Sequence, residues 1–113
     1  MIVDDLLLVI TTLPDRNSAE EMAKRLVEDN LGACVSVVPD LKSFFRWKGQ
    51  VEEASEFLLI IKTRDYEKLE KAVLDLHPYE VPELIALRAD EAYSKYYEWI
   101  CNGSCQTQES GLS

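Results

Sequence analysis

The sequence predicts one α+β domain in which an antiparallel sheet carries its connecting helices on one face. Apolar runs typical of strands are interleaved with segments whose apolar residues recur with a helical period. Two long β-rich arms, at residues 33–47 and 51–62, are joined by the tight turn Lys48-Gly49. The chain has 113 residues, which is enough for one hydrophobic core and too few for two.

The first strand and the first helix occupy the N-terminal third. Residues 6–12 form an apolar run, typical of a strand that is buried on both faces, and Pro14 ends it. Ser18 and Glu21 have the spacing of a capping box, which predicts that the helix begins at Ser18. Gly32 is expected to end this helix with a left-handed backbone conformation. The predicted buried stripe consists of Ala19, Met22, Ala23, Leu26 and Val27.

The two arms predict an unusually long hairpin. Pro39 marks a bend or bulge in the first arm. A two-residue turn places Phe45 opposite Glu52 and Leu41 opposite Glu56.

The length of this hairpin exceeds the size of its domain. At about 3.3 Å per residue it spans roughly 40–50 Å, whereas a domain of this size has a radius of gyration of about 13 Å. We therefore expect its outer part to project. That part carries Phe44, Phe45 and Trp47, so we expect it to lie on a partner chain.

A helix, a strand and a last helix complete the domain. Asp65 is expected to cap the second helix, which ends before Pro78 because a residue preceding proline avoids the helical region. Residues 83–87 form the fourth strand, and Asp90 caps the third helix. The predicted inner positions are Tyr66, Leu69, Val73 and Leu76 on the second helix, and Tyr93, Tyr96, Tyr97 and Ile100 on the third.

The predicted element order, strand–helix–strand–strand–helix–strand, is the ferredoxin-like arrangement with an extra C-terminal helix. We assign residues 1–103 to this domain and expect the polar residues 104–113 to form a frayed tail. Three of the strands are apolar on both faces, so the face without helices would expose a large apolar patch. Closed symmetric association is the usual way to cover one. The alternative is that the third helix alone covers it.

Composition excludes several classes of protein. The net charge of −9 disfavours binding to nucleic acid phosphates. No apolar run approaches the roughly 18–20 residues that span a bilayer, and the acidic start does not resemble a secretory signal. Three cysteines without a dense framework indicate free thiols in a reducing compartment. We therefore predict a cytoplasmic protein.

His77, the only histidine, is the first candidate metal ligand, with Glu83 or a cysteine completing the site. We favour the structural interpretation, a histidine that satisfies carbonyls at a helix end, because one imidazole per chain is not the pattern of a dedicated zinc site. A site shared between chains would weaken that objection. Cys34 lies on the second strand, where a buried inert thiol is the default.

Other polar residues give weaker signals. Lys62 closes an apolar run, either as a partly buried amine or as a lysine that surfaces at a strand end, with Glu56 and Glu83 as possible ionic partners. Cys101 and Cys105 are interpreted as two unrelated thiols, with a shared soft metal or a disulfide between them as the alternatives. No nucleophile–base pair and no glycine-rich phosphate loop is apparent, so we predict that the chain is not an enzyme and has no organic cofactor.

Several short segments, in this order and spacing, resemble the CutA divalent-ion tolerance proteins, over about residues 6–100. They are Ala33-Cys34-Val35, Arg46-Trp47-Lys48-Gly49, Glu56, Ile61-Lys62-Thr63 and the block from His77-Pro78-Tyr79 to Pro82-Glu83. The closing Tyr97-Glu98-Trp99-Ile100 is similar too, with Glu98 where the family usually has leucine.

The resemblance implies a ferredoxin-like fold, a homotrimer with long hairpins pairing between subunits, and a link to tolerance of divalent metals such as copper, bound weakly. It also implies that five residues surround clefts between subunits: Trp47, Lys62, His77, Tyr79 and Glu83. Cys34 matches the family's strand cysteine, whereas Cys101 and Cys105 fall outside the pattern.

Three function hypotheses follow. One is a stable scaffold whose function is defined by an unidentified protein partner, and the other two concern a bound ligand. In the first, a trimer binds Cu²⁺ or a similar ion through His77 with Glu83, aided by Cys34, since copper prefers imidazole and thiolate. In the second, by analogy with nitrogen-regulatory PII proteins, the cleft binds a small anionic metabolite through Lys62 and Arg46, with Trp47 packing on it.

Overall fold

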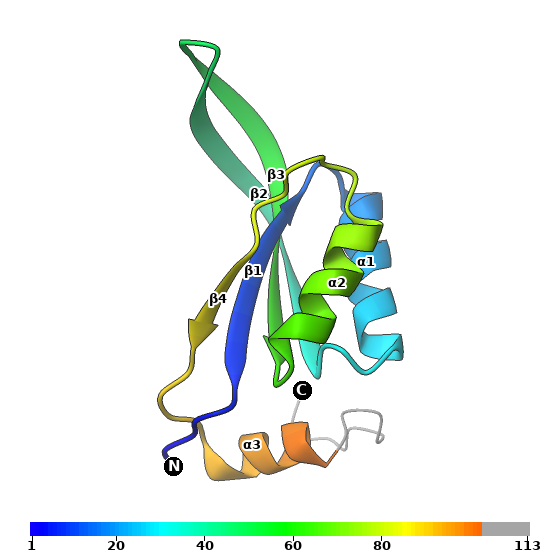
Figure 1. Ribbon diagram of the computed structural model, residues 1–113, viewed down its shortest axis with the longest axis vertical. Coiled ribbons are helices and arrows are strands. Elements are labelled where there is room, and N and C mark those ends of the chain that lie inside the picture. The colour runs from blue at the N-terminus through cyan, green and yellow to red at the C-terminus, as the bar shows by residue number, and fades with distance from the viewer. Residues whose placement is uncertain (103–113) are drawn as a thin grey trace.

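In the computed structural model, which describes residues 1–102, the chain forms one four-stranded antiparallel sheet and three helices (Figure 1). The elements run in the order β1 Leu7–Leu13, α1 Arg16–Glu28, β2 Cys34–Trp47, β3 Gln50–Thr63, α2 Tyr66–Leu76, β4 Ile85–Arg88 and α3 Ser94–Cys101. The strand order is β2-β3-β1-β4, and every neighbouring pair is antiparallel. The predicted α+β class is confirmed. The predicted tail lies outside the described residues.

The register of the β2–β3 hairpin agrees with the sequence prediction. Phe45 pairs with Glu52 and Leu41 with Glu56. The turn residues Lys48 and Gly49 have φ values of 50° and 80°, the left-handed pair that a type I′ turn requires. This turn therefore fixes which side chains of the hairpin face each other.

The expected irregularity at Pro39 is also present. The pairing of β2 with β3 shifts between Val38 and Leu41, and Asp40 has a φ of 63°. An extra residue in one strand bends it and increases its twist. The hairpin therefore changes direction near the point where it leaves the rest of the sheet.

The outer half of the hairpin projects from the body of the molecule (Figure 1). β1 pairs with residues 57–63 of β3, so β2 is the only strand within residues 1–102 that pairs with residues 50–56. The longest dimension of the molecule is 47 Å, and its radius of gyration of 15.2 Å exceeds the roughly 13 Å of a compact domain. Phe44 and Trp47, at 64% and 60% exposed, lie on this projection.

Helices α1 and α2 cover one face of the sheet (Figure 1). The fully buried core lies between them and this face, and it consists of Val9, Leu13, Ala19, Met22, Ala23, Leu26, Leu59, Ile61, Leu69 and Val73. The predicted helix stripes are confirmed at most positions. The exceptions lie at the helix ends: Val27 and Tyr66 are half-buried, and Leu76 is exposed.

The opposite face of the sheet carries the alternate side chains of the same strands. We call it the open face, and its apolar residues are Leu8, Ile10, Val38, Leu58, Ile60, Ile85 and Leu87. Helix α3 does not cover it, because α3 lies beyond one end of the sheet (Figure 1). There Ile100 packs with Val3 and Leu6 in a small second core. No helix within residues 1–102 is long and apolar enough to cross a membrane.

Two predicted helix starts were wrong. Helix α1 begins at Arg16, because the Asp15 carboxylate accepts the Ser18 N–H at 2.8 Å and Asp15 is the N-cap. Helix α3 has Tyr93 at its N-cap without a side-chain cap, whereas the carbonyl of Asp90 accepts the Val3 N–H at 3.0 Å. Tyr93 is 68% exposed and does not belong to the inner face of α3.

The left-handed residue after α1 is Asn30, with a φ of 58°, and not Gly32. Asparagine tolerates this conformation better than other residues with a Cβ. Gly32 lies in a tight space instead: a Cβ there would lie 3.0 Å from Val35 Cγ2 and 3.1 Å from Ile61 Cγ2, so these side chains would have to shift. The predicted caps of α2, Asp65 at its start and an end before Pro78, are confirmed.

Paired substitutions distinguish the two N-cap assignments for α1. We expect Asp15→Ala to lower the free energy of unfolding by about 1 kcal/mol, because the Ser18 N–H loses its acceptor. We expect Ser18→Ala to cost less than about 0.5 kcal/mol. Urea unfolding at one protein concentration measures both. A larger loss for Ser18→Ala would restore Ser18 as the cap.

Candidate functional site

The structure distributes the predicted site residues over three places along the hairpin. Glu56, Tyr79 and Glu83 line one depression at the base of the projecting part. Cys34 and Lys62 pair at the opposite end of the sheet, six residues along β3 from Glu56, or roughly 20 Å. Trp47 lies at the hairpin turn, about as far from Glu56 in the other direction.

Glu56 is a buried carboxylate, 8% exposed, on β3. The Tyr79 hydroxyl donates to its Oε2 at 2.8 Å from the segment between α2 and β4. Burial, followed by this hydrogen bond, raises the pKa of Tyr79 to about 12, so the phenol keeps its proton and remains a donor at neutral pH. The contact therefore ties the α2–β4 segment to β3.

His77 forms the C-cap of α2, and both of its ring nitrogens have partners. Nε2 lies 2.8 Å from the carbonyl oxygen of Thr12, and Nδ1 accepts the Tyr79 N–H at 3.1 Å. These partners require the neutral tautomer with its proton on Nε2. Burial lowers the pKa of His77, although the Thr12 carbonyl and the nearby Glu56 carboxylate act in the opposite direction.

The three predicted metal ligands, His77, Glu83 and Cys34, do not fit together around one ion in a single chain. His77 has no free ring nitrogen, and Cys34 lies at the far end of the sheet. Nowhere within residues 1–102 do three histidine, cysteine or acidic side chains come close enough to hold a metal. The hydrogen bonds of both ring nitrogens support the structural role of His77 that the sequence analysis favoured, and a metal role for these residues stays a prediction.

Lys62 and Cys34 form a second polar group on the open face. Lys62 Nζ lies 3.5 Å from Ser36 Oγ and 4.0 Å from Cys34 Sγ. Tyr96 of α3 contacts the same thiol, and burial, followed by Cys34, raises the pKa of Tyr96 to about 12. Sequence reasoning did not assign Ser36 or Tyr96 to this group, because the proximity of Ser36 to Lys62 depends on strand register and that of Tyr96 to Cys34 depends on the docking of α3.

Trp47 and Arg46 do not approach Lys62 within one chain. Arg46 pairs with Val51, eleven residues along β3 from Lys62, which corresponds to roughly 36 Å. Lys48 Nζ lies 5.9 Å from the centre of the Trp47 ring, within the range of a cation–π contact. An anion site built from Lys62, Arg46 and Trp47 would therefore need more than one chain.

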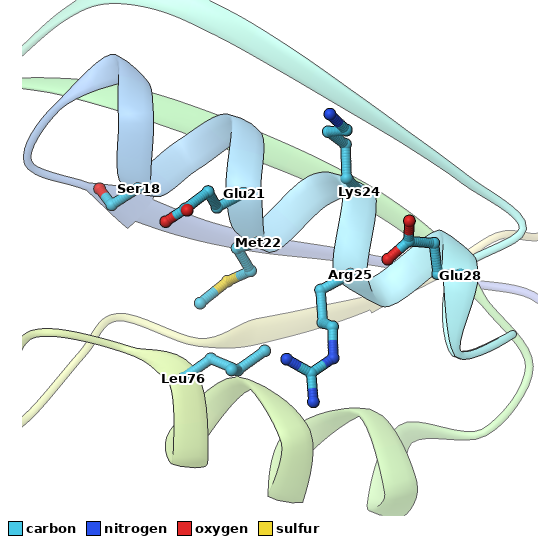
Figure 2. A pocket seen from close by; sticks show the side chains of 7 residues that line it. All are labelled: Ser18, Glu21, Met22, Lys24, Arg25, Glu28 and Leu76. Carbon is cyan, nitrogen blue, oxygen red and sulfur yellow. The ribbon is translucent and has the colours of Figure 1, made fainter.

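Another hollow lies between α1 and α2, on the helix side (Figure 2). It has a volume of about 430 Å³, and Met22, Arg25 and Leu76 point into the space between the two helices. Arg25 is paired with Asp29 at 3.2 Å. The hollow contains no predicted site residue, so it is separate from the depression around Glu56.

The environment of His77 predicts acid sensitivity. The folded chain holds His77 neutral, whereas the unfolded chain binds a proton below about pH 6.5, so the free energy of unfolding falls as the pH drops through and below that value. We expect His77→Gln to be less stable at pH 7.5 but to lose less stability between pH 7.5 and 5.5. Chemical unfolding at several pH values tests this, and equal slopes would contradict it.

Comparison with known proteins identifies the family. The model of the CutA1 divalent ion tolerance protein family matches residues 7–103. The divalent-cation tolerance protein CutA of Thermus thermophilus is 45% identical over 94 residues, which cover 81% of this chain and 91% of that protein. The chloroplastic CutA of Arabidopsis thaliana is 41% identical over 100 residues, but this chain spans only 55% of its length.

Solved structures agree with the sequence comparison. CutA from Xylella fastidiosa superposes with a TM-score of 0.84 at 36% identity, covering 88% of this chain and 97% of that one. The periplasmic divalent cation tolerance protein CutA from Archaeoglobus fulgidus gives 0.83 at 35% identity, covering 88% and 98%. With matches over most of its length in both comparisons, the chain belongs to the CutA1 divalent ion tolerance protein family.

Proposed function

We propose that this chain works as a homotrimer in the tolerance of divalent cations and that it binds Cu²⁺ or a similar ion weakly at clefts between subunits. Family membership supports the tolerance function. The strand order, with α1 and α2 on one face, supports the ferredoxin-like topology. We also propose that the protein is not an enzyme and uses no organic cofactor, in line with the family's description as tolerance proteins.

The observation that carries the assembly is the open face. Ile85 and Leu87 are 49% and 53% exposed, and the other apolar residues of this face, apart from the exposed Val38, are only half-buried. Each such side chain contributes up to about 1.5–3 kcal/mol when it is fully buried. Large contiguous apolar patches on soluble proteins mark interfaces. Association through this face is therefore favourable, and the family resemblance supplies the number three.

A metal site in this assembly would draw on more than one chain. Structural metal sites use four protein ligands and catalytic zinc sites three, and no such group forms within residues 1–102. Glu83 is exposed at the depression near the hairpin base, where it remains available as one ligand. We propose that ligands from a neighbouring copy, or water, complete the coordination, which is consistent with weak binding.

The free thiols bear on the compartment in which the protein works. Cys34 and Cys101 are free thiols, which suits the reducing cytoplasm. Relatives carry names that place them in the chloroplast or the periplasm. We propose the cytoplasm for this chain, and fractionation of its cells tests that placement.

Two equally exposed leucines on different faces test the interface. We expect Leu87→Asp, on the open face, to convert the assembly to smaller species, because it places a charge in the buried contact. Leu74→Asp, on α2 at 52% exposed, is the matched control and keeps the assembly intact. Light scattering after size exclusion measures the mass. A wild-type single chain would contradict the trimer.

Native mass spectrometry before and after copper addition tests assembly and metal together. We expect three chains and a copper count that saturates. Glu83→Gln lowers that count because it removes a carboxylate charge, whereas Glu80→Gln, an exposed neighbour outside the depression, leaves it unchanged. A trimer that retains no copper would remove the metal part of the proposal and leave the assembly intact.

A further inference from the structure

The hollow between α1 and α2 has the dimensions of a small-molecule site (Figure 2). Its volume is about 430 Å³, within the 300–1,000 Å³ that such sites usually have. It lies on the helix side of the sheet, opposite the open face (Figure 1). Association through the open face therefore leaves this hollow accessible to a ligand.

Two apolar side chains form the floor and one side of the hollow. Met22 on α1 is 3% exposed and Leu76 at the end of α2 is 38% exposed, and both point into the space between the helices (Figure 2). Methionine is flexible and packs against ligands of different shapes. An apolar group that enters this space also removes part of Leu76 from water, which favours binding.

Arg25 is held by an ion pair that leaves one edge of its guanidinium available. Asp29, one turn further along α1, accepts from Arg25 Nε at 3.2 Å. The guanidinium extends into the space between the two helices (Figure 2), so the edge that carries both Nη groups can reach a ligand there. Such an edge donates two parallel hydrogen bonds to one carboxylate.

Glu21 supplies the opposite charge on the same wall. It lies four residues before Arg25 on α1, a spacing that places the two Cβ atoms about 5–6 Å apart on one helix face. Arg25 pairs with Asp29 instead, and the Glu21 carboxylate has no ion pair within residues 1–102. These two side chains can therefore bind an ammonium group and a carboxylate of the same ligand.

The charges of the lining balance, which disfavours a ligand of one sign. Glu21 and Glu28 offset Lys24 and Arg25. A simple anion would meet both carboxylates, and a simple cation would meet both basic side chains. A ligand that carries one charge of each sign is complementary to both.

We propose that this hollow binds a free α-amino acid with an apolar side chain. Its carboxylate accepts hydrogen bonds from Arg25, its ammonium group donates to Glu21, and its side chain packs between Met22 and Leu76. This binding goes beyond the tolerance of divalent cations and does not depend on it.

L-leucine is a suitable probe, and two analogues of similar shape each lack one charged group. Isocaproate lacks the amine, and isopentylammonium lacks the carboxylate. We expect the full-length protein to bind leucine saturably, with a Kd on the order of 1 mM because exposed ion pairs contribute little. We expect each analogue to bind at least about fivefold more weakly. NMR shifts of the Met22, Arg25 and Leu76 amides measure the affinity and report the location.

Two variants with matched controls test the carboxylate contact and the apolar wall. We expect Arg25→Gln to weaken leucine binding by about fivefold or more. Arg16→Gln removes an arginine of α1 that has the same kind of pair, with Glu20, outside the hollow, and leaves the affinity unchanged. We expect Leu76→Ala to weaken binding by about threefold, whereas Leu74→Ala, at an exposed position of α2 outside the hollow, has no effect.

Glu21→Gln tests recognition of the ammonium group. We expect it to weaken leucine binding by about threefold and to leave isocaproate binding unchanged or tighter, because isocaproate has no ammonium group and is repelled by the carboxylate. Glu20→Gln, an exposed neighbour outside the hollow, changes neither affinity. A mere structural effect of Glu21→Gln would weaken both ligands alike and would contradict this contact.

Three further results would overturn the proposal. The first is the absence of saturable leucine binding by the wild-type protein. The second is equal binding of leucine and both analogues, which would reduce the site to an apolar hollow. The third is a set of shifts confined to the strands, which would place the amino acid away from α1 and α2.

Discussion

Only one face of the sheet is covered by this chain's own helices, and much of the structure follows from that asymmetry. The core residues Val9 and Ile61 face α1 and α2, so the alternate residues Ile10 and Ile60 must face the other way. Because α3 lies beyond the end of the sheet, it leaves those side chains half-buried. The projecting hairpin extends the same imbalance, since within residues 1–102 its two outer arms pair only with each other and project beyond the helices (Figure 1).

A short relay of hydrogen bonds connects this fold to the depression around Glu56. The Thr12 carbonyl on β1 holds His77, His77 receives the N–H of Tyr79, and the Tyr79 hydroxyl holds Glu56 on β3. These hydrogen bonds cap the C-terminus of α2. They also fix the position of Tyr79 in the wall of the depression. His77 therefore shapes the depression through Tyr79, without lining it.

The sequence pattern around the turn predicted the hairpin well, because a two-residue turn with positive φ values allows only one pairing register between the two strands. They failed at the start of α1, where Asp15 and Ser18 both have capping side chains and only backbone geometry decides between them. They also could not place the partners of His77, because Thr12 is 65 residues away in the sequence. The proximity of Glu56, Tyr79 and Glu83 likewise depends on how the α2–β4 segment crosses the sheet.

Two charged side chains on β3, Glu56 and Lys62, affect which surface can pack against the sheet, in addition to its exposed apolar residues. Lys62 has no carboxylate within 4 Å in residues 1–102, and Glu56 has no cation there. They lie roughly 20 Å apart, well beyond the screening length of about 8 Å at physiological salt, so they cannot neutralise each other. Glu56 is buried and Lys62 is half-buried. A second copy that covers the sheet is therefore expected to bring apolar surface to the open face, and charges opposite to those of Glu56 and Lys62 would favour its docking at the two ends.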